Sequence, residues 1–118
     1  MPKKIVISHI GGPEVLEYVD YDISNKIGDN DVRIKQTAIG LNYIDTYHRS
    51  GIYPLPLEFP ICPGLEAAGT IIDKGANVKN FDEGDKVCYA TTPIGAYCEI
   101  RDFPADKTIK IPSEISED

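Results

Sequence analysis

The sequence is poor in cysteine and in positive charge, and each shortage excludes a class of protein. Lysine and arginine total 12 against 19 aspartates and glutamates, a net charge of −7 that repels a phosphate backbone, so no nucleic-acid partner is expected. The three cysteines, Cys62, Cys88 and Cys98, are an odd number without C-x-x-C spacing, which argues against a disulfide framework. We expect reduced, mostly buried thiols in no recognisable arrangement of nucleophile, base and orienting group.

Long apolar runs are also missing. No stretch approaches the roughly 18 residues that span a bilayer, so membrane insertion is not expected. The start, Met1-Pro2-Lys3-Lys4, leads directly into a short apolar segment and has no signal-peptide h-region. These features predict a cytoplasmic protein.

What the chain does contain is a series of short β-rich runs. Its 118 residues, 42% of them apolar, suffice for one domain with a real core. Turn residues rich in Gly, Pro and Asp separate the runs, the first two forming a hairpin-type opening. The predicted strands are 4–8, 15–21, 31–39, 67–72, 86–90, 95–101 and 108–111. Many short strands at fairly regular spacing predict an all-β barrel or sandwich with one or two helical turns.

One helix interrupts this pattern, over residues 42–50. Asn42 is a good N-cap, Asp45 lies near the first-turn amides, and Gly51 suits the C′ position. The segment 53–60 carries three prolines and is expected to be an extended surface loop. The last residues, 113–118, resemble a helix start with Ser116 as a cap, and we expect them to begin the connection to another domain.

Five segments in order carry a family resemblance. They are Gly11-Gly12-Pro13-Glu14-Val15-Leu16, residues 38–51, residues 63–69, Gly84-Asp85-Lys86-Val87 and Gly95-Ala96-Tyr97. Each is weak alone, but together they resemble the zinc-free quinone oxidoreductases (zeta-crystallin-like) of the medium-chain dehydrogenase/reductase superfamily. The resemblance implies a GroES-like β-barrel with short helices over residues 1–112, the N-terminal domain of an NADPH:quinone oxidoreductase.

The same resemblance implies that NADPH binds between this domain and a Rossmann domain. The chain has no G-x-G-x-x-G opening a helix after a strand, so that second domain is absent from it. We expect the isolated chain to bind NADPH weakly or not at all, and to be inactive in transferring hydride to a quinone.

The resemblance also bears on metal content. In the zinc-dependent alcohol dehydrogenases of the superfamily a cysteine stands at the position of Asn42 and a histidine at that of Leu65, and both bind the catalytic metal. An amide binds zinc poorly and leucine has no donor atom, so no zinc is expected. Glu66, in an otherwise apolar segment, is expected to find a hydrogen-bonded or charged partner.

Site residues follow from the resemblance. It implies that Asn42 and Tyr47 face the nicotinamide end of NADPH, with Leu65 also among the cofactor-binding residues. Tyr47 and Tyr53 are the implied catalytic residues, Tyr53 stacking on a quinone ring at the rim of the cleft. The residue pattern alone leaves simpler roles open, because Asn42 can serve only as a helix cap, Tyr47 can pack beside Ile44, and Tyr53 can be a surface anchor.

Other residues receive plainer interpretations. His9 and His48 have no ligand partners at recognisable spacing and are expected to be solvated, while Tyr89 and Tyr97 are expected to pack within strands. Two rival functions also remain open. The chain can be a stand-alone β-barrel that acts as an interaction module through self-association, or one half of a split reductase that pairs with a separate Rossmann domain.

Purified protein is expected to contain no zinc, because neither Asn42 nor Leu65 can replace the missing thiolate and imidazole. Elemental analysis after exhaustive dialysis measures this directly. Zinc at one equivalent per chain would contradict the prediction.

Overall fold

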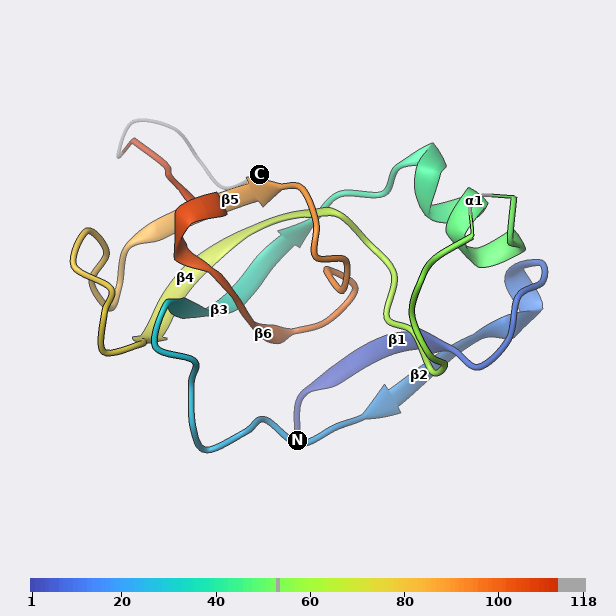
Figure 1. Ribbon diagram of the computed structural model, residues 1–118, viewed down its shortest axis with the longest axis horizontal. Coiled ribbons are helices and arrows are strands. Elements are labelled where there is room, and N and C mark those ends of the chain that lie inside the picture. Colours follow the sequence, from blue (N-terminus) through green and yellow to red (C-terminus); the bar gives the residue numbers. More distant parts are fainter. Residues whose placement is uncertain (53, 113–118) are drawn as a thin grey trace.

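The chain opens with a β-hairpin. The computed structural model describes residues 1–52 and 54–112, and in it β1 (Lys3–Ile7) and β2 (Leu16–Asp20) pair antiparallel, from Lys3↔Asp20 to Ile7↔Leu16 (Figure 1). A short 3-10 helix, η1 (Pro13–Val15), connects them, with the proline at its first turn, where no backbone N–H is needed. The predicted hairpin opening is confirmed.

The remaining strands form a five-stranded antiparallel sheet in the order β6-β3-β4-β5-β7. The two long central strands are β3 (Asp31–Ile39) and β4 (Glu66–Lys74), which pair from Val32↔Lys74 to Ile39↔Ala67. The others are β5 (Lys86–Ala90), β6 (Ile100–Pro104) and β7 (Ile109–Lys110). The predicted strands 31–39 and 86–90 match β3 and β5.

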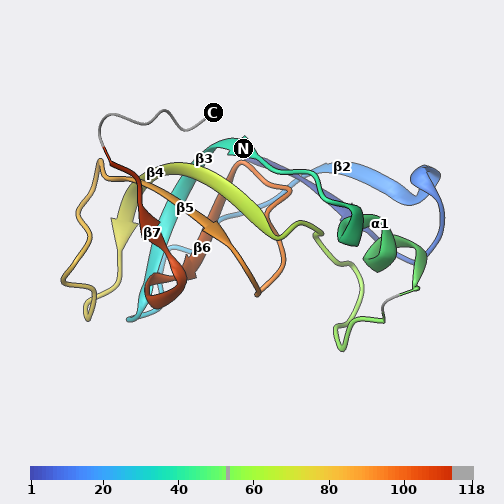
Figure 2. The same cartoon turned by 90° about the horizontal axis from the view of Figure 1, so that it is seen from above.

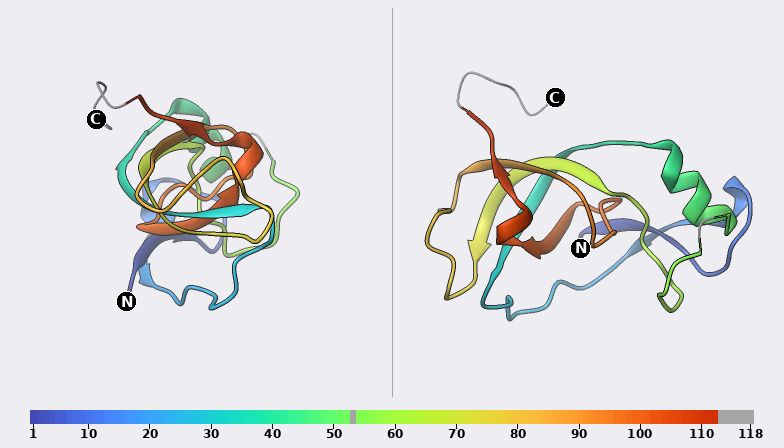
Figure 3. Two further views of the ribbon diagram at one scale, coloured as in Figure 1. Left: turned by 90° about the vertical axis from the view of Figure 1, so that its left-hand side faces the viewer. Right: turned by 45° about the horizontal axis from the view of Figure 1, so that its top comes forward.

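The sheet curls round on itself. Its two edge strands, β6 and β7, are consecutive in the chain and joined only by the 3-10 helix η2 (Ala105–Lys107), so the two edges approach each other (Figures 2 and 3). No ladder joins β6 to β7 in the described part of the chain, so the barrel is incompletely hydrogen-bonded. The architecture is the expected mainly-β, GroES-like one with short helices.

The core fills the inside of this curled sheet. Val32 and Ile34 of β3 are fully buried while Arg33 and Lys35 face outward, the alternation that predicted this strand. Tyr89 and Phe103 stack across the core with ring centroids 4.0 Å apart. A smaller cluster of Ile7, Val15 and Ile61 attaches the hairpin to the rest of the molecule.

The predicted strand 95–101 is wrong in its first half, since β6 begins only at Ile100. Gly95 has a φ of 126°, which breaks an extended strand. The Gln36 side chain then takes the place of a ladder, its Nε2 donating to the carbonyl oxygens of Ala96 at 2.9 Å and Cys98 at 2.7 Å. The segment 95–99 is therefore held by one side chain from β3 together with scattered backbone bonds.

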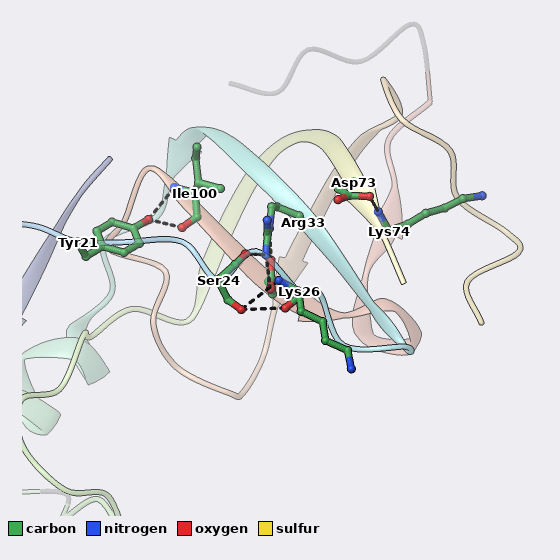
Figure 4. Close-up of polar contacts among 8 residues, drawn as sticks. Tyr21, Ser24, Lys26, Arg33, Asp73, Lys74 and Ile100 are labelled. Atoms are coloured by element: carbon green, nitrogen blue, oxygen red, sulfur yellow. Dashed lines mark hydrogen bonds and ion pairs between the residues drawn. The ribbon is translucent and has the colours of Figure 1, made fainter. Parts of the chain in front are cut away.

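Side chains also hold the long connection between β2 and β3 (Figure 4). The Tyr21 hydroxyl donates to the carbonyl of Ile100 and accepts the Ile100 N–H at 3.1 Å. Arg33 donates to the carbonyl of Ser24 at 2.7 Å and forms an ion pair with Asp102, 2.7 Å from Nε to Oδ1. This two-pronged contact with a carboxylate holds the pKa of Arg33 above its usual range, chiefly through the hydrogen bond to Asp102.

Two expectations concern the limits of the fold. Residues 113–118, expected to begin a connection to another domain, lie outside the described residues. Within the described ranges, no helix combines the length and the apolar character needed to cross a bilayer.

The substitution Gly69→Ala is expected to destabilise the fold by about 1–3 kcal/mol, because overpacking a buried position costs this much. A Cβ at Gly69 would lie 2.3 Å from the Lys35 carbonyl oxygen and 2.8 Å from the Gln36 Cα, both backbone atoms of β3 that cannot move aside. Urea unfolding measures the change.

The matched control is Gly12→Ala, whose Cβ would approach only the flexible side chain of Glu14. Its unfolding free energy should stay within about 0.5 kcal/mol of the parent value, as for most surface changes. Equal effects of the two substitutions would contradict the packing argument.

Candidate functional site

The candidate site lies where β3 and β4 meet at one end of the sheet. β3 ends at Ile39 and β4 begins at Glu66, and the pairing continues one step further through the Gly40 N–H, which donates to the Glu66 carbonyl at 3.0 Å. Antiparallel pairing therefore brings the residues that follow β3, with Asn42 the third of them, to the same end of the sheet as Leu65, which precedes β4.

Gly40 leaves room for a neighbouring side chain at this junction. A Cβ at Gly40 would overlap the Glu66 side chain, which would have to move if any other residue stood there. Glu66 is half-buried here, and no hydrogen bond or ion pair to its carboxylate is found among the described residues. The charged or hydrogen-bonded partner expected for Glu66 is therefore not observed within the described part of the chain.

The helix α1 (Tyr43–Ser50) begins directly beyond this junction. Asn42 is its N-cap, with extended φ and ψ of −124° and 154°. The Asn42 N–H donates to Oδ2 of Asp45 at 3.1 Å, and the Asp45 N–H donates to the Asn42 carbonyl at 3.0 Å. At the other end Gly51 has a φ of 85° and donates its N–H to the Tyr47 carbonyl, so the predicted cap residues are both confirmed.

Asp45 also forms a contact that no local pattern indicates. Its carboxylate is 4% exposed, and Oδ2 accepts a hydrogen bond from the Tyr97 hydroxyl at 2.6 Å. Burial, followed by the bond to Asp45, raises the pKa of Tyr97 well above its ordinary value. The other oxygen, Oδ1, is buried and has no hydrogen-bond partner among the described residues, so it can still accept a donor.

Tyr47 lies on the outward face of α1. It is 41% exposed, and its ring lies 6.3 Å from that of Tyr43, one turn earlier and 83% exposed. The simpler interpretation, a tyrosine packed beside Ile44, therefore describes Tyr47 only in part. This helix therefore presents two exposed tyrosine side chains to solvent.

A cavity of about 360 Å³ opens beside the junction. Most of its lining is aliphatic, from the ends of β3, β4 and β5, with Glu66 as the one charged side chain. The lining residues are Ala38, Ile39, Gly40, Glu66, Ala67, Ala68, Cys88, Tyr89, Ala90 and Ile109. Neither Asn42 nor Leu65 lines this cavity, although Glu66, the residue after Leu65, does.

The structure thus brings Asn42, Tyr47 and Leu65 to one end of the sheet but does not test their roles. Tyr53 lies outside the described residues. His48 corrects an expectation, because it is 5% exposed and not solvated, whereas His9 is exposed. Nor is Tyr97 a simple packing residue, and its partner Asp45 lies 52 positions away in the chain, beyond the reach of any spacing rule.

In the described residues, no group of three or more His, Cys, Asp or Glu side chains is arranged to hold a metal ion. The expected absence of zinc stays a prediction.

Comparison with known proteins places these features in a family. The alcohol dehydrogenase GroES-like domain matches residues 28–113. A quinone oxidoreductase of Pseudomonas aeruginosa is 46% identical over 115 residues, which cover 98% of this chain and 35% of that protein. A 2-haloacrylate reductase of Burkholderia sp. is 41% identical, over 96% of this chain and 34% of that protein.

Solved structures agree. A quinone oxidoreductase of Pseudomonas syringae pv. Tomato DC3000 superposes with a TM-score of 0.93 at 44% identity, over 99% of this chain and 35% of that one. The Escherichia coli quinone oxidoreductase complexed with NADPH gives the same TM-score at 40% identity, over 98% of this chain and 35% of that one. The chain therefore spans about a third of the length of the relatives that it matches.

Replacing Tyr97 by Phe is expected to lower the free energy of unfolding by about 1–3 kcal/mol, the usual penalty when a buried polar group loses a partner. The substitution removes the hydroxyl that donates to Asp45 and leaves both the ring and the backbone in place. Urea unfolding of the variant measures the loss.

Tyr18→Phe is the matched control, because Tyr18 is 65% exposed on β2 and its hydroxyl makes no hydrogen bond within the described residues. The control should unfold like the parent. If Tyr97→Phe also unfolds like the parent, the bond to Asp45 contributes nothing to stability.

Proposed function

The chain belongs to the alcohol dehydrogenase GroES-like domain family, and from this membership we propose that it is the substrate-side domain of an NADPH-dependent quinone oxidoreductase. The observation that carries the proposal is the match of nearly the whole chain to one third of several quinone oxidoreductases, at up to 46% identity. The complete reaction then requires a cofactor-binding domain in addition to these residues.

The residues at the junction of β3, β4 and α1 fit the nicotinamide end of NADPH. Tyr47 offers an exposed hydroxyl, Asn42 an amide at the start of α1, and Asp45 a buried oxygen without a partner. These are the donors and acceptors that a carboxamide and a ribose require. Leu65 adds an apolar side chain at the same end of the sheet, suited to packing against a flat ring.

When bound, NADPH supplies the hydride, the step that the protein itself cannot perform. Asn42 and Tyr47 then orient the nicotinamide by hydrogen bonds, and the capping interaction between Asp45 and Asn42 keeps the start of α1 fixed. The aliphatic cavity at the ends of β3, β4 and β5 keeps water away from the flat acceptor. Tyr53 is proposed to stack on that acceptor.

The acceptor is an electron-poor conjugated molecule. A quinone accepts hydride readily, so a metal ion is not required to polarise its carbonyl, in keeping with Asn42 and Leu65 at the positions of zinc ligands. The similarity to a 2-haloacrylate reductase supports a second acceptor class, a halogen-substituted acrylate, whose double bond is also electron-poor.

The isolated chain is proposed to be inactive. Among its described residues no glycine-rich loop opens a helix long enough to hold a pyrophosphate, since α1 is the only α-helix there and begins after Asn42. A stand-alone interaction module and one half of a split enzyme are the alternatives. All three predict no NADPH oxidation by the chain alone and differ when a cofactor domain is supplied.

The decisive experiment joins this chain to the cofactor-binding remainder of the Pseudomonas aeruginosa relative and follows NADPH absorbance with 1,4-benzoquinone or 2-chloroacrylate. The fusion should oxidise NADPH with the quinone, and the chain and the remainder should each be inactive alone. A folded fusion that binds NADPH but reduces neither acceptor would contradict the proposal and favour the interaction module.

In the active fusion, Tyr47→Phe is expected to lower kcat/KM about tenfold, because one hydrogen bond is worth about 1–1.5 kcal/mol. Tyr43→Phe, one turn earlier on α1 and more exposed, is the control and should leave kcat/KM unchanged. A similar loss in both variants would show that Tyr47 has no specific role.

A further inference from the structure

Two of the three cysteines lie together, beside β1. Cys98 forms an isolated β-bridge with Lys4 of β1, and Cys62 lies in the segment that leads to β4. The Cys62 Sγ is 3.5 Å from the Tyr97 carbonyl oxygen, the backbone group that directly precedes Cys98. The Cys98 Sγ donates to the Gly95 carbonyl oxygen at 3.2 Å.

A cavity of about 230 Å³ contains both sulfur-bearing residues in its wall. Asp22 and Ser24, which are exposed, line it as well, so the cavity reaches the surface. Cys98 itself is only 5% exposed, and Cys62 is half-buried. A reagent of a few atoms can therefore enter, while a bulky one is excluded.

The surroundings of Cys98 favour its thiolate. The neighbouring Cys62 lowers the pKa of Cys98 below its ordinary value, with Arg101, Tyr21 and Lys4 adding to the effect and burial opposing it. The Gln36 Nε2 also donates to the Cys98 Sγ, at 3.5 Å. Of the two carboxylates in the cavity wall, Asp22 and Asp102, the second is already paired with Arg33.

Cys62 is held in the opposite state. The neighbouring Cys98, followed by burial, raises the pKa of Cys62 above its ordinary range. A thiolate with a second thiol beside it is the arrangement in which one cysteine is oxidised and the other resolves the product.

We propose that Cys98 and Cys62 form a peroxide-reactive dithiol in which Cys98 is the nucleophile and Cys62 the resolving residue, and which closes to an intramolecular disulfide. The Cys98 thiolate attacks one oxygen of hydrogen peroxide, the S–O bond forms as the O–O bond breaks, and hydroxide leaves. The Cys62 sulfur then attacks the sulfenic acid, the S–S bond forms, and the hydroxyl group leaves with the Cys62 proton as water. The two thiols lose two electrons, and peroxide is reduced to two waters.

The pair uses none of the side chains that the proposed function requires, since Asn42, Tyr47 and Leu65 do not line its cavity. Cys88 provides an internal control. It lies on β5, lines the other cavity and is also half-buried. Exposure alone therefore does not distinguish Cys88 from Cys62, whereas a neighbouring thiol does.

The test is differential alkylation of the unaltered 118-residue chain after a short exposure to hydrogen peroxide, followed by denaturation and peptide mapping. Two of the three thiols should be lost, in a single cross-linked peptide pair containing Cys62 and Cys98, while Cys88 stays alkylated. Dithiothreitol should restore all three. Retention of all three thiols, a disulfide between chains, or one that includes Cys88 would overturn the proposal.

Variants assign the two roles. In Cys62→Ser, peroxide should leave Cys98 as a sulfenic acid that dimedone traps, because no resolving thiol remains. In Cys98→Ser, the thiol count should not change on exposure, and Cys88→Ser should cross-link like the parent. Circular dichroism checks that each variant is folded, and dimedone labelling of Cys62 in place of Cys98 would reverse the assignment and overturn it.

Discussion

The antiparallel pairing of β3 with β4 is the constraint on which the rest of the molecule depends. These are the longest strands of the sheet, and they lie inside it, so β3 also pairs with β6 and β4 also pairs with β5. Gly69 permits the close approach in the middle of the pair, where a Cβ would meet the backbone of β3. At the end of the pair, Gly40 leaves room for the Glu66 side chain.

The middle of the pair carries an irregularity with consequences far away. Between Gln36 and Ala38 the register shifts by one residue, and Gln36 faces Gly69, which has no side chain. The Gln36 amide donates to Ala96 and Cys98, and its oxygen accepts the Tyr89 hydroxyl. A single side chain thus links β3, β5 and the segment before β6, and satisfies carbonyl groups that a ladder would otherwise have to satisfy.

This dependence explains how far the sequence predicts the structure. Strands with one buried face, such as β3 and β5, show a period of two that is visible locally, and the cap residues Asn42 and Gly51 act within their own helix. The segment 95–99 shows the same alternation, yet its hydrogen bonds go to a side chain from another strand. Likewise the contact between Tyr97 and Asp45 joins residues far apart in the chain, so no periodicity or capping rule could reveal it. The strands and helix caps, which depend on neighbouring residues, could be predicted from the sequence. The path of 95–99 and the Tyr97–Asp45 bond depend on contacts between distant segments and could not.

The segment 95–99 also connects the two regions to which function is assigned. Tyr97 donates to the carboxylate that holds the start of α1, and Cys98, the next residue, lies in the second cavity beside Cys62. One short stretch therefore contacts both regions. Backbone hydrogen bonds to Lys3, Ile5, Pro63 and Gly64 hold this stretch in place. A covalent bond formed at Cys98 would therefore act on Tyr97 through a single peptide unit, and from there on Asp45 and the N-terminus of α1.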